Sequence, residues 1–420
     1  MNVFLIGHGG REHALGWKLA QSPSLTQLWS TGANPGLLAL SQPSHVDMAD
    51  HDAIVAFCKA NSIDLVVVGP EVPLVAGLVD DLAAAGIAAF GPGREAAQLE
   101  GSKHFTKALC DEANIPTAGF GHFSNLEDAR AYVAEQGAPI VIKADGLAAG
   151  KGVTVAMTDD EADVALRDCF DGQFGDAGAS VVIEEFLEGE EASIFILCDG
   201  ENMVPMASAQ DHKRVGEGDT GPNTGGMGAY SPAPVVSDAV LEQTLQTIIA
   251  PTLKTLAARG TPYRGVLYAG LMINENGPKL IEYNCRFGDP ECQVLMMRMQ
   301  SDLLPLLSAS ATGSLKDAAI DWHDDPAMTV VMASNGYPGS YGKGSIISGL
   351  EALTDQENVV VFHAGTKEVN DQILADGGRV LTVTARADTI KAAQQRAYEA
   401  VDRIDWPEGF CRRDIGWRAV

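Results

Sequence analysis

The chain has 420 residues, nearly half of them hydrophobic, which is enough for about three domains with proper cores and excludes a disordered protein. Its net charge of −27 argues against nucleic acid or an anionic membrane as a partner, because a phosphate backbone requires an excess of Lys and Arg. Any anionic substrate must therefore meet a local basic cluster.

The cysteines and the N-terminus indicate the compartment. Seven cysteines form no CxxC pair and no zinc spacing, and an odd number is awkward for a disulfide framework, so we expect reduced thiols. There is no basic segment before an apolar run, and no apolar run approaches about 18 residues, so neither export nor a membrane span is indicated. We expect a cytoplasmic monomer whose partners are small molecules, with no nucleic acid and no membrane.

The first hundred residues predict an N-terminal doubly wound parallel sheet. Short apolar strands alternate with amphipathic helices; the strands are expected at 3–6, 65–68 and 88–90, and the helices at 10–20, 52–60 and 73–85. Ligands of such sheets bind at the carboxyl ends of the strands, where Gly9, Asn34 and Glu71 lie.

The first strand ends in a glycine turn that could bind phosphate. The backbone amides of Gly9 and Gly10 start a helix, with Arg11 beside them. A dinucleotide fingerprint is the obvious rival, but its third glycine falls on Glu12 and no acidic residue follows the second strand near Ser30. A purely structural turn between strand and helix remains an alternative.

A second glycine-rich feature lies at residues 138–153. Lys143 ends an apolar strand, and Gly150, Lys151 and Gly152 follow in a loop between two antiparallel strands. This is not a Walker A loop, because the framing glycines enclose three residues and Gly152 replaces the Ser or Thr that would hold a metal. A Lys in a glycine loop can close over a triphosphate and neutralise it; an ordinary flexible hairpin is the alternative.

A helix capped by Ser102 leads to this flap, and a strand at 181–183 runs into Glu184 and Glu185. A strand followed by carboxylates could offer backbone groups to an adenine edge and a carboxylate to ribose hydroxyls, although an acidic run is more often a solvated edge.

Residues 211–214, Asp-His-Lys-Arg, are the densest basic spot in the chain, and the glycine-rich segment 221–232 follows closely. We expect this segment, which contains Asn223, to form a long structured loop whose amides approach a ligand. His212 could act as a base, but it is flanked by charged residues, and we interpret it as a surface or supporting residue.

The segment Lys279 to Glu291, KLIEYNCRFGDPE, predicts the metal site. Strand alternation places Leu280, Glu282 and Asn284 on one face. A carboxylate and an amide oxygen one pleat apart suit a hard cation such as Mg²⁺, which keeps waters and bridges substrate phosphates. The alternative is an ordinary strand with two polar residues facing solvent. The neighbouring Cys285 is interpreted as a small buried residue and not as a nucleophile.

Single helices are expected at 240–258 and 294–307, the second packing beneath the metal-bearing strands. After about residue 325 the pattern changes to short strands at 329–333, 359–363 and 380–384 and a helix at 389–404. We interpret this as a small α+β domain that carries no cluster of ionisable residues and completes a wall of the active site.

Taken together, GHGGREHA, GPE, GSK, VIKADGLAAGKGV, IEEFLEGEEAS, QDHKRVGEGDTGPNTGGMGAYSP and EYNCRFGDPE resemble the glycinamide ribonucleotide synthetase family, the glycine ligases of purine synthesis in the ATP-grasp superfamily. These motifs run from residue 7 to residue 291, and FHAGTK and GGRVL extend the match. His8 stands where Asn is common in the family. The resemblance implies a doubly wound N-terminal domain at 1–101, an ATP-grasp domain at 102–325 with its flap at about 117–190, and a C-terminal α+β domain at 326–420.

The resemblance also implies roles for particular residues. ATP, a co-substrate, would be bound by Lys103, Lys143, Gly150, Lys151, Gly152, Glu184, Glu185, Leu187 and Glu191. Mg²⁺ or Mn²⁺ would be held by Glu282 and Asn284. The substrates would contact Gly9, Gly10, Arg11, Asn34, Glu71 and Asn223. The catalytic residues would be Lys213, Arg286 and Asp211.

The implied reaction joins glycine to 5-phosphoribosylamine, with ATP converted to ADP and phosphate through a glycyl phosphate. Another ATP-grasp ligase acting on a phosphoribosyl intermediate is the nearest alternative. A non-catalytic nucleotide sensor is a third, while a nicotinamide-dependent oxidoreductase is disfavoured by the failed fingerprint.

Overall fold

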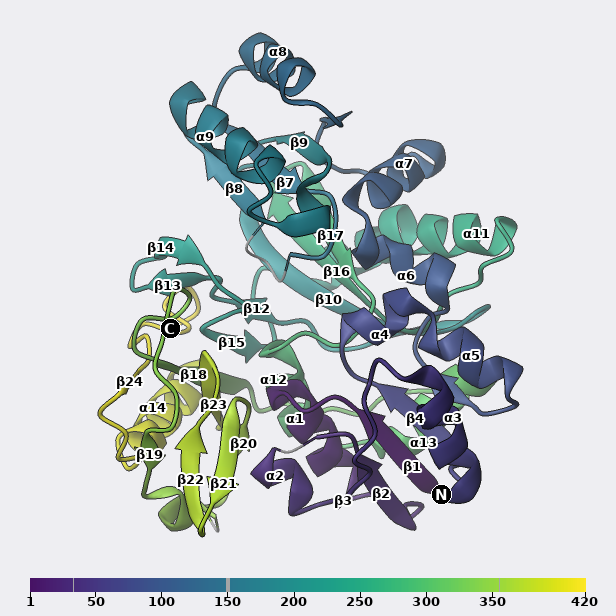
Figure 1. Ribbon diagram of the computed structural model, residues 1–420, viewed down its shortest axis with the longest axis vertical. Helices are drawn as coiled ribbons and strands as arrows, with labels where there is room; N and C mark the ends of the chain where they lie inside the picture. Colours follow the sequence, from purple (N-terminus) through teal and green to yellow (C-terminus); the bar gives the residue numbers. More distant parts are fainter. Residues whose placement is uncertain (33, 149–151, 355) are drawn as a thin grey trace.

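Short parallel strands build the N-terminal lobe of the computed structural model, which describes residues 1–32, 34–148, 152–354 and 356–420 (Figure 1). The strands follow the order β3-β2-β1-β4-β5 and are all parallel, so the expected doubly wound sheet is confirmed. They are β1 (Asn2–Ile6), β2 (Gln27–Ser30), β3 (Gln42–Pro43), β4 (Leu65–Val68) and β5 (Ala89–Phe90). The helices are α1 (Gly10–Leu19), α2 (Pro35–Leu38), α3 (His51–Ala60), α4 (Glu71–Ala76), α5 (Leu78–Ala84) and α6 (Arg94–Gly101).

The helix expected at 73–85 is divided in two at Gly77. This residue has a φ of 92°, a left-handed conformation that ends α4 and that glycine adopts without steric cost.

The flap is a separate antiparallel sheet with two helices on it, at the top of Figure 1. Its strands have the order β6-β9-β7-β8, and α7 leads into it with the Ser102 hydroxyl accepting the N–H of Phe105 at its start. The elements are α7 (Lys103–Ala113), β6 (Phe120–Phe123), α8 (Leu126–Gln136), β7 (Ile140–Ala144), β8 (Val153–Ala156), α9 (Asp159–Phe170), the 3₁₀ turn Gly175–Gly178 and β9 (Val181–Glu185).

The central sheet forms the floor below the flap, in the order β11-β10-β16-β17. It comprises β10 (Glu190–Asp199), β11 (Met203–Pro205), β16 (Arg264–Asn274) and β17 (Gly277–Asn284). The ten-residue strand β10 was not predicted, because its first residues, Glu190 and Glu191, resemble a solvated acidic run.

A β-bulge changes the expected alternation in β17. Gly270 pairs with Glu282 and the next residue, Leu271, pairs with Leu280, so that Ile281 is the extra residue. Leu280 is consequently buried in the core with Tyr283, and the prediction that Leu280 shares a face with Glu282 is wrong.

Three further expectations about the central domain are corrected. The helix expected at 240–258 contains a π turn, and the helix expected at 294–307 is two helices, because the Asp302 carboxylate caps the second one by accepting the N–H of Leu304. The helices are α10 (Asp238–Thr244), α11 (Ala250–Ala258), α12 (Glu291–Arg298) and α13 (Leu303–Thr312), with the π turn at Leu245–Ile249. The expected loop at 221–232 is largely strand: β13 (Arg214–Gly216) and β14 (Thr220–Asn223) form a hairpin, and β15 (Gly228–Ser231) follows.

The C-terminal lobe shares its main sheet with the central domain. The order β12-β15-β18-β23-β20 joins β12 (Gln210–Asp211) and β15 to β18 (Ala327–Ser334), β23 (Arg379–Arg386) and β20 (Val359–His363), and β24 (Gly409–Phe410) pairs with β18. The remaining elements are β19 (Ile346–Ile347), the 3₁₀ turn Leu350–Leu353, β21 (Thr366–Val369), β22 (Gln372–Ala375) and α14 (Ile390–Val401). The expectation that this lobe carries no cluster of ionisable residues is wrong, because Arg412 pairs with both Asp414 and Asp219, and Arg418 pairs with Asp219 as well.

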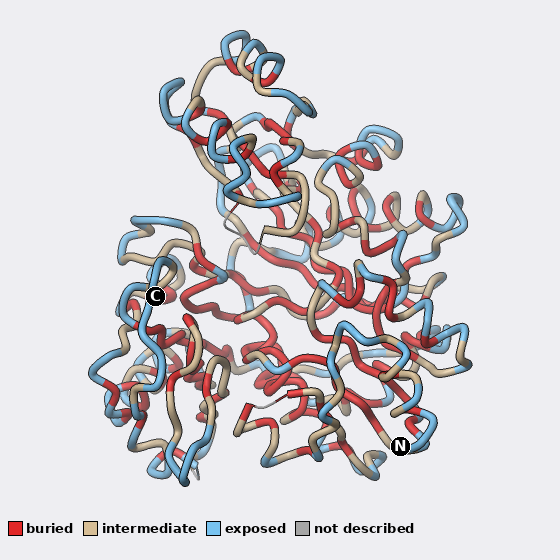
Figure 2. The backbone as a smooth tube through the Cα atoms, in the orientation of Figure 1, coloured by how far each residue is buried: buried red, intermediate tan, exposed pale blue. Residues whose placement is uncertain are grey.

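The lobes are joined by a common apolar core. One buried cluster contains Leu5 of β1, Leu295 of α12 and Phe362 of β20, and buried positions run through the middle of the molecule in Figure 2. All seven cysteines have free thiols, and burial raises the pKa of Cys285, consistent with a packed residue and not a nucleophile. In the described part of the chain, no helix combines the length and the apolar character needed to cross a membrane.

A buried histidine lies at the contact between the N-terminal and C-terminal lobes. The Nδ1 atom of His13 accepts the backbone N–H of His363 at 2.8 Å, and its ring lies edge-on to Phe362. Burial, and then the neighbouring His363 ring, lower the pKa of His13 to about 3. The ring is therefore neutral in the folded protein.

Acid should weaken this contact. Below a pH of about 6.5 His13 becomes protonated in the unfolded chain but stays neutral in the folded chain. The free energy of unfolding therefore decreases as the pH is lowered, by up to roughly 1.4 kcal/mol per pH unit. Replacing His13 by Gln should flatten the dependence of the unfolding free energy on pH between 6.5 and 4, measured by urea denaturation. His8→Gln, at an exposed position, is the control, and equal slopes in wild type and His13→Gln would contradict this account.

Candidate active site

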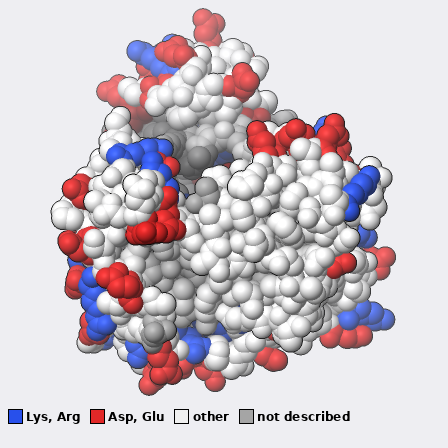
Figure 3. All heavy atoms as spheres, turned by 60° about the horizontal axis from the view of Figure 1, so that its bottom comes forward, with Lys and Arg blue, Asp and Glu red and all other residues white. Residues whose placement is uncertain are grey.

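A cavity of about 650 Å³ lies between the flap and the central sheet, and both outer lobes reach it. Figure 3 shows the hollow between the upper lobe and the body, with Lys and Arg side chains at its border. Among the described residues, nine Lys and Arg side chains line it, namely Arg11, Lys103, Lys107, Lys143, Lys213, Arg214, Arg286, Arg379 and Arg418. The expected local basic cluster is therefore present, although eleven carboxylates lie among these cations.

One end of the cavity is an apolar slot between two sheets. Val141, Val153 and Val155 of the flap line one side, and Met272 and Ile281 of the central sheet line another. The connection from β9 to β10 closes the slot with Phe186 and Leu187. An apolar lining of this kind is suited to a purine base.

A buried carboxylate between two lysines lies next to this slot. Glu184 is 3% exposed, and its oxygens lie 2.8 Å from Lys143 Nζ and 3.2 Å from Lys107 Nζ. Burial lowers the pKa of Lys107, and Glu184 opposes this shift. Lys107 was missed in the sequence, although it lies one helical turn after Lys103 on α7 and so faces the same way.

Lys103 faces the same space from the start of α7. Its ammonium donates to the carbonyl oxygen of Gly146 at 3.0 Å, which ties the helix to the loop after β7. Burial lowers the pKa of Lys103, and the Glu282 carboxylate opposes the shift.

The predicted metal corner contains Glu282 and Asn284 on β17. Burial alone would raise the pKa of Glu282, but Lys213, Lys143 and Lys103 together hold it at about 2, so the carboxylate stays ionised. Within the described residues, no three His, Cys, Asp or Glu side chains gather as a metal cage. An ionised carboxylate and an amide oxygen fit a hard cation that takes its other ligands from water and phosphate.

Lys213 lies between two carboxylates at the centre of the cavity. Its ammonium is 3.4 Å from Glu282 and pairs more closely with Glu191. The structure thus assigns Glu191 a lysine partner, and its predicted role as a ribose acceptor stays a prediction.

Arg286 is held by two carboxylates of the N-terminal lobe, one on α4 and one on α6. Its guanidinium lies 2.8 Å from Glu100 and 3.3 Å from Glu71, and it donates to the Asn284 side-chain oxygen at 2.9 Å. Burial would lower the pKa of Arg286, but Glu100 and Glu71 raise it above the usual value, so the group is a fixed cation. Arg11 Nη1 approaches Glu71 at 3.9 Å, which places it in the same corner.

Two carboxyl groups in the cavity are shifted towards their neutral forms. Burial raises the pKa of Asp211 well above its usual value, with Lys213 opposing the shift. Burial likewise raises the pKa of Glu291, which accepts the Tyr268 hydroxyl at 2.8 Å. Glu291 was quoted as part of a motif but was not predicted as a site residue.

Several predicted substrate contacts lie away from the described lining of the cavity. The Gly9 amide donates to the Glu12 carboxylate at 2.6 Å, and the Arg11 amide approaches Asp289 at 3.4 Å, so carboxylates already occupy the start of α1. Asn34 is buried, where its side chain accepts the Leu37 N–H and donates to the carbonyl oxygen of His363. The polar groups of Gly9 and Asn34 therefore stabilise local structure.

The other predicted contacts divide into three groups. Gly152, Glu185, Leu187, Asp211 and Asn223 line the cavity as expected, whereas Gly10 does not. Gly150 and Lys151 lie outside the described residues.

The C-terminal lobe contributes Arg379 to the cavity. This residue lies within the GGRVL motif and donates to the carbonyl oxygens of Gly225 and Asp289, each at 2.6 Å.

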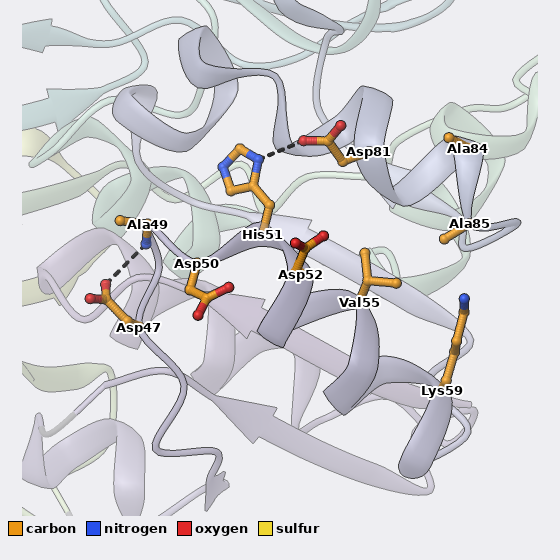
Figure 4. A pocket seen from close by; sticks show the side chains of 10 residues that line it. All are labelled: Asp47, Ala49, Asp50, His51, Asp52, Val55, Lys59, Asp81, Ala84 and Ala85. Carbon is orange, nitrogen blue, oxygen red and sulfur yellow. Dashed lines mark hydrogen bonds and ion pairs between the residues drawn. The ribbon is translucent and has the colours of Figure 1, made fainter.

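A second hollow, on the N-terminal lobe, has the opposite character. Four aspartates line it, and His51 Nδ1 lies 2.6 Å from Asp81 (Figure 4). An acidic hollow repels phosphate, so it is no rival for an anionic substrate.

Comparison with known families agrees with these observations. Models of the phosphoribosylglycinamide synthetase N domain, ATP-grasp (A) domain and C domain match residues 1–100, 101–292 and 327–418. The chain belongs to the phosphoribosylglycinamide synthetase family. The resemblance seen in the sequence motifs is thereby confirmed.

Relatives within the phosphoribosylglycinamide synthetase family match the chain from end to end. The phosphoribosylamine–glycine ligase of Mesorhizobium japonicum is 61% identical over 420 residues, with 100% of this chain and 99% of the relative covered. That of Vibrio cholerae is 54% identical, with the same coverage.

Solved structures agree on the fold. The crystal structure of the phosphoribosylamine–glycine ligase of Thermotoga maritima has a TM-score of 0.87 at 30% identity and covers 99% of this chain and 100% of its own. The biotin carboxylase of Campylobacter jejuni has a TM-score of 0.73 at 15% identity, covering 97% and 92%, and shows the fold alone. The predicted fold class, with a parallel N-terminal sheet, an ATP-grasp centre and a small C-terminal domain, is confirmed.

The two adjacent glutamates at the end of β9 should respond differently to substitution. Glu184→Gln leaves two buried lysines without their counter-charge, so we expect a loss of about 3–5 kcal/mol in unfolding free energy. Glu185→Gln, at an exposed position, should stay within about 0.5 kcal/mol of wild type. Urea denaturation measures both, and equal effects would contradict the counter-charge role of Glu184.

Proposed function

We propose that this chain uses ATP to join glycine to 5-phosphoribosylamine, forming glycinamide ribonucleotide, ADP and phosphate in purine synthesis. The observation that carries the proposal is the convergence of nine cations from all three domains on one cavity in a strongly acidic chain. A triphosphate, a carboxylate and a sugar phosphate must meet for this reaction, and all three are anions. The names of the family and of its full-length relatives support the same reaction.

The apolar slot would hold adenine, and the lysines beside it would hold the triphosphate. Lys103 on α7, Lys143 on β7 and Lys213 in the connection between β12 and β13 line the same space, so they can contact different phosphate oxygens. Glu282 and Asn284 would hold Mg²⁺ or Mn²⁺, which would supply further positive charge next to the phosphates.

Arg286 would orient the glycine carboxylate, because a fixed guanidinium can bind a carboxylate through two parallel hydrogen bonds. Arg11 and Glu71, in the same corner, would contact the sugar amine. Asp211, close to Lys213, would contact the ammonium group of glycine.

No protein nucleophile is required for the chemistry. A glycine carboxylate oxygen attacks the γ-phosphorus, the bond to the β-phosphate oxygen breaks, and ADP leaves a glycyl phosphate. The amine nitrogen of the sugar then attacks the acyl carbon and loses a proton, and the bond to phosphate breaks. The protein contributes positioning and charge neutralisation, as in other phosphoryl transfers.

The direct test is ADP release from purified protein with ATP and Mg²⁺. Phosphoribosylamine is generated in the assay from ribose 5-phosphate and ammonia. The mixtures contain both glycine and phosphoribosylamine, only one of them, or neither. We expect ADP release only when glycine and the sugar amine are both present. Release with another amino acid in place of glycine, or silence in every mixture, would contradict the proposal.

Removing the charge of Glu282 should abolish turnover. Glu282→Gln is expected to lower kcat/KM at least about 100-fold, because charge stabilisation at the phosphates is worth several kcal/mol. Glu275→Gln is the matched control, since Glu275 is exposed in the turn between β16 and the same strand. Full activity in Glu282→Gln, at unchanged melting temperature, would contradict the metal assignment.

A further inference from the structure

The C-terminal tail, residues 412–418, folds against the β13–β14 hairpin, far away in the sequence. Figure 1 shows the end of the chain beside this hairpin. Asp414 accepts the backbone N–H of Gly218 at 2.8 Å, and Arg412 Nη1 donates to Asp219 at 2.9 Å. Arg418 pairs with Asp219 as well, and both residues line the cavity.

The tail contacts the residues on both sides of Lys213. The ring of His212, which is fully buried, accepts the backbone N–H of Gly416 at its Nε2 atom, at 2.9 Å. On the other side, the backbone carbonyl oxygen of Arg214 accepts a hydrogen bond from Arg412 Nη1, also at 2.9 Å. His212 was expected to be a surface or a supporting residue, and the surface alternative is wrong, because the ring is fully buried under the tail.

Asp219 connects these two contacts. Because His212 Nε2 accepts a hydrogen bond, a neutral ring carries its proton on Nδ1, which faces Asp219 at 3.6 Å. The facing His212 ring lowers the pKa of Asp219, and Arg412 and Arg418 lower it further, against the effect of burial. The aspartate is therefore a permanent anion that can hold both Arg412 and Arg418.

Lys213 depends on such support. Its ammonium lies on a flexible four-carbon stem, between the carboxylates of Glu191 and Glu282. A displacement of its backbone by about 1 Å would move the ammonium relative to the phosphates, and misplacement of that size is costly in catalysis.

We propose that the C-terminal tail is a positioning element of the active site, which fixes the backbone on both sides of Lys213 and so aims its ammonium at the phosphates of ATP. The proposal rests on the proposed function, in which Lys213 contacts ATP. Arg412 is a positioning residue, because it reaches the phosphates only through Lys213.

A double-mutant cycle on ATP affinity tests this inference. The Kd for ATP is measured by titration in wild type, Arg412→Ala, Lys213→Ala and the double variant. We expect Arg412→Ala to weaken binding about tenfold, as for the loss of a charge-assisted contact, and to have no further effect once Lys213 is removed. A purely structural role of Arg412 would instead give additive effects.

Arg413→Ala is the matched control. Its guanidinium pairs with Asp402 at 2.6 Å, away from the hairpin, so its Kd should equal that of wild type. Arg412→Lys keeps the charge but offers a single nitrogen in place of the three that bond to Asp414, Asp219 and the Arg214 carbonyl, so an intermediate Kd is expected. Arg412 is buried, so Arg412→Ala could fail to fold; in that case Arg412→Lys replaces it in the double-mutant cycle.

Additive effects in the cycle, a wild-type Kd in Arg412→Ala or a wild-type Kd in Lys213→Ala would each overturn the inference. The titration contains neither glycine nor the sugar amine, so it decides on the tail whether or not the ligation assay succeeds.

Discussion

The active-site cavity depends on cations that are buried in a strongly acidic protein but are not paired so tightly that substrate anions are excluded. Two carboxylates in the cavity are each shared by two cations. Glu184 lies between Lys143 and Lys107, and Glu71 is approached by both Arg286 and Arg11. A carboxylate that is shared by two cations neutralises each of them only in part, so both can still attract a substrate anion. The fold brings these charges together from distant parts of the chain.

Each domain contributes to this arrangement through a rigid element. The N-terminal lobe provides Arg11 on α1, the central sheet provides Glu282 on β17, and the C-terminal lobe provides Arg379 on β23. The lobes are fused by a common core and by the contact of His13 with the backbone of His363. The positions of the cations therefore depend on packing far from the cavity, which is why the interface and the tail matter for function.

Much of the fold could be predicted from the sequence, because periodicity is local. The apolar run of β4 and the Ser102 cap of α7 were predicted at the correct positions. The bulge at Ile281 and the division between α12 and α13 could not be predicted. The first depends on strand pairing and the second on helix capping, and hydrophobic periodicity indicates neither. The acidic start of β10 conceals a strand that only its neighbours stabilise.

The candidate site was predictable where a motif carries the chemistry on one element, as with Glu282 and Asn284. It was not predictable where the role depends on a distant partner. Glu71 and Glu100 hold Arg286, and Arg412 bonds to the carbonyl oxygen of Arg214, 198 residues earlier in the chain. No local pattern indicates such contacts.

The central claim is that the cavity brings the glycine carboxylate against the γ-phosphate, so that the acid is activated by phosphorylation. The most direct measurement uses glycine labelled with ¹⁸O in its carboxylate and follows the label by mass spectrometry during a complete reaction. The account predicts one ¹⁸O atom in each inorganic phosphate released, because the acyl oxygen leaves with the phosphoryl group. Unlabelled phosphate, formed at the rate of ligation, would contradict it.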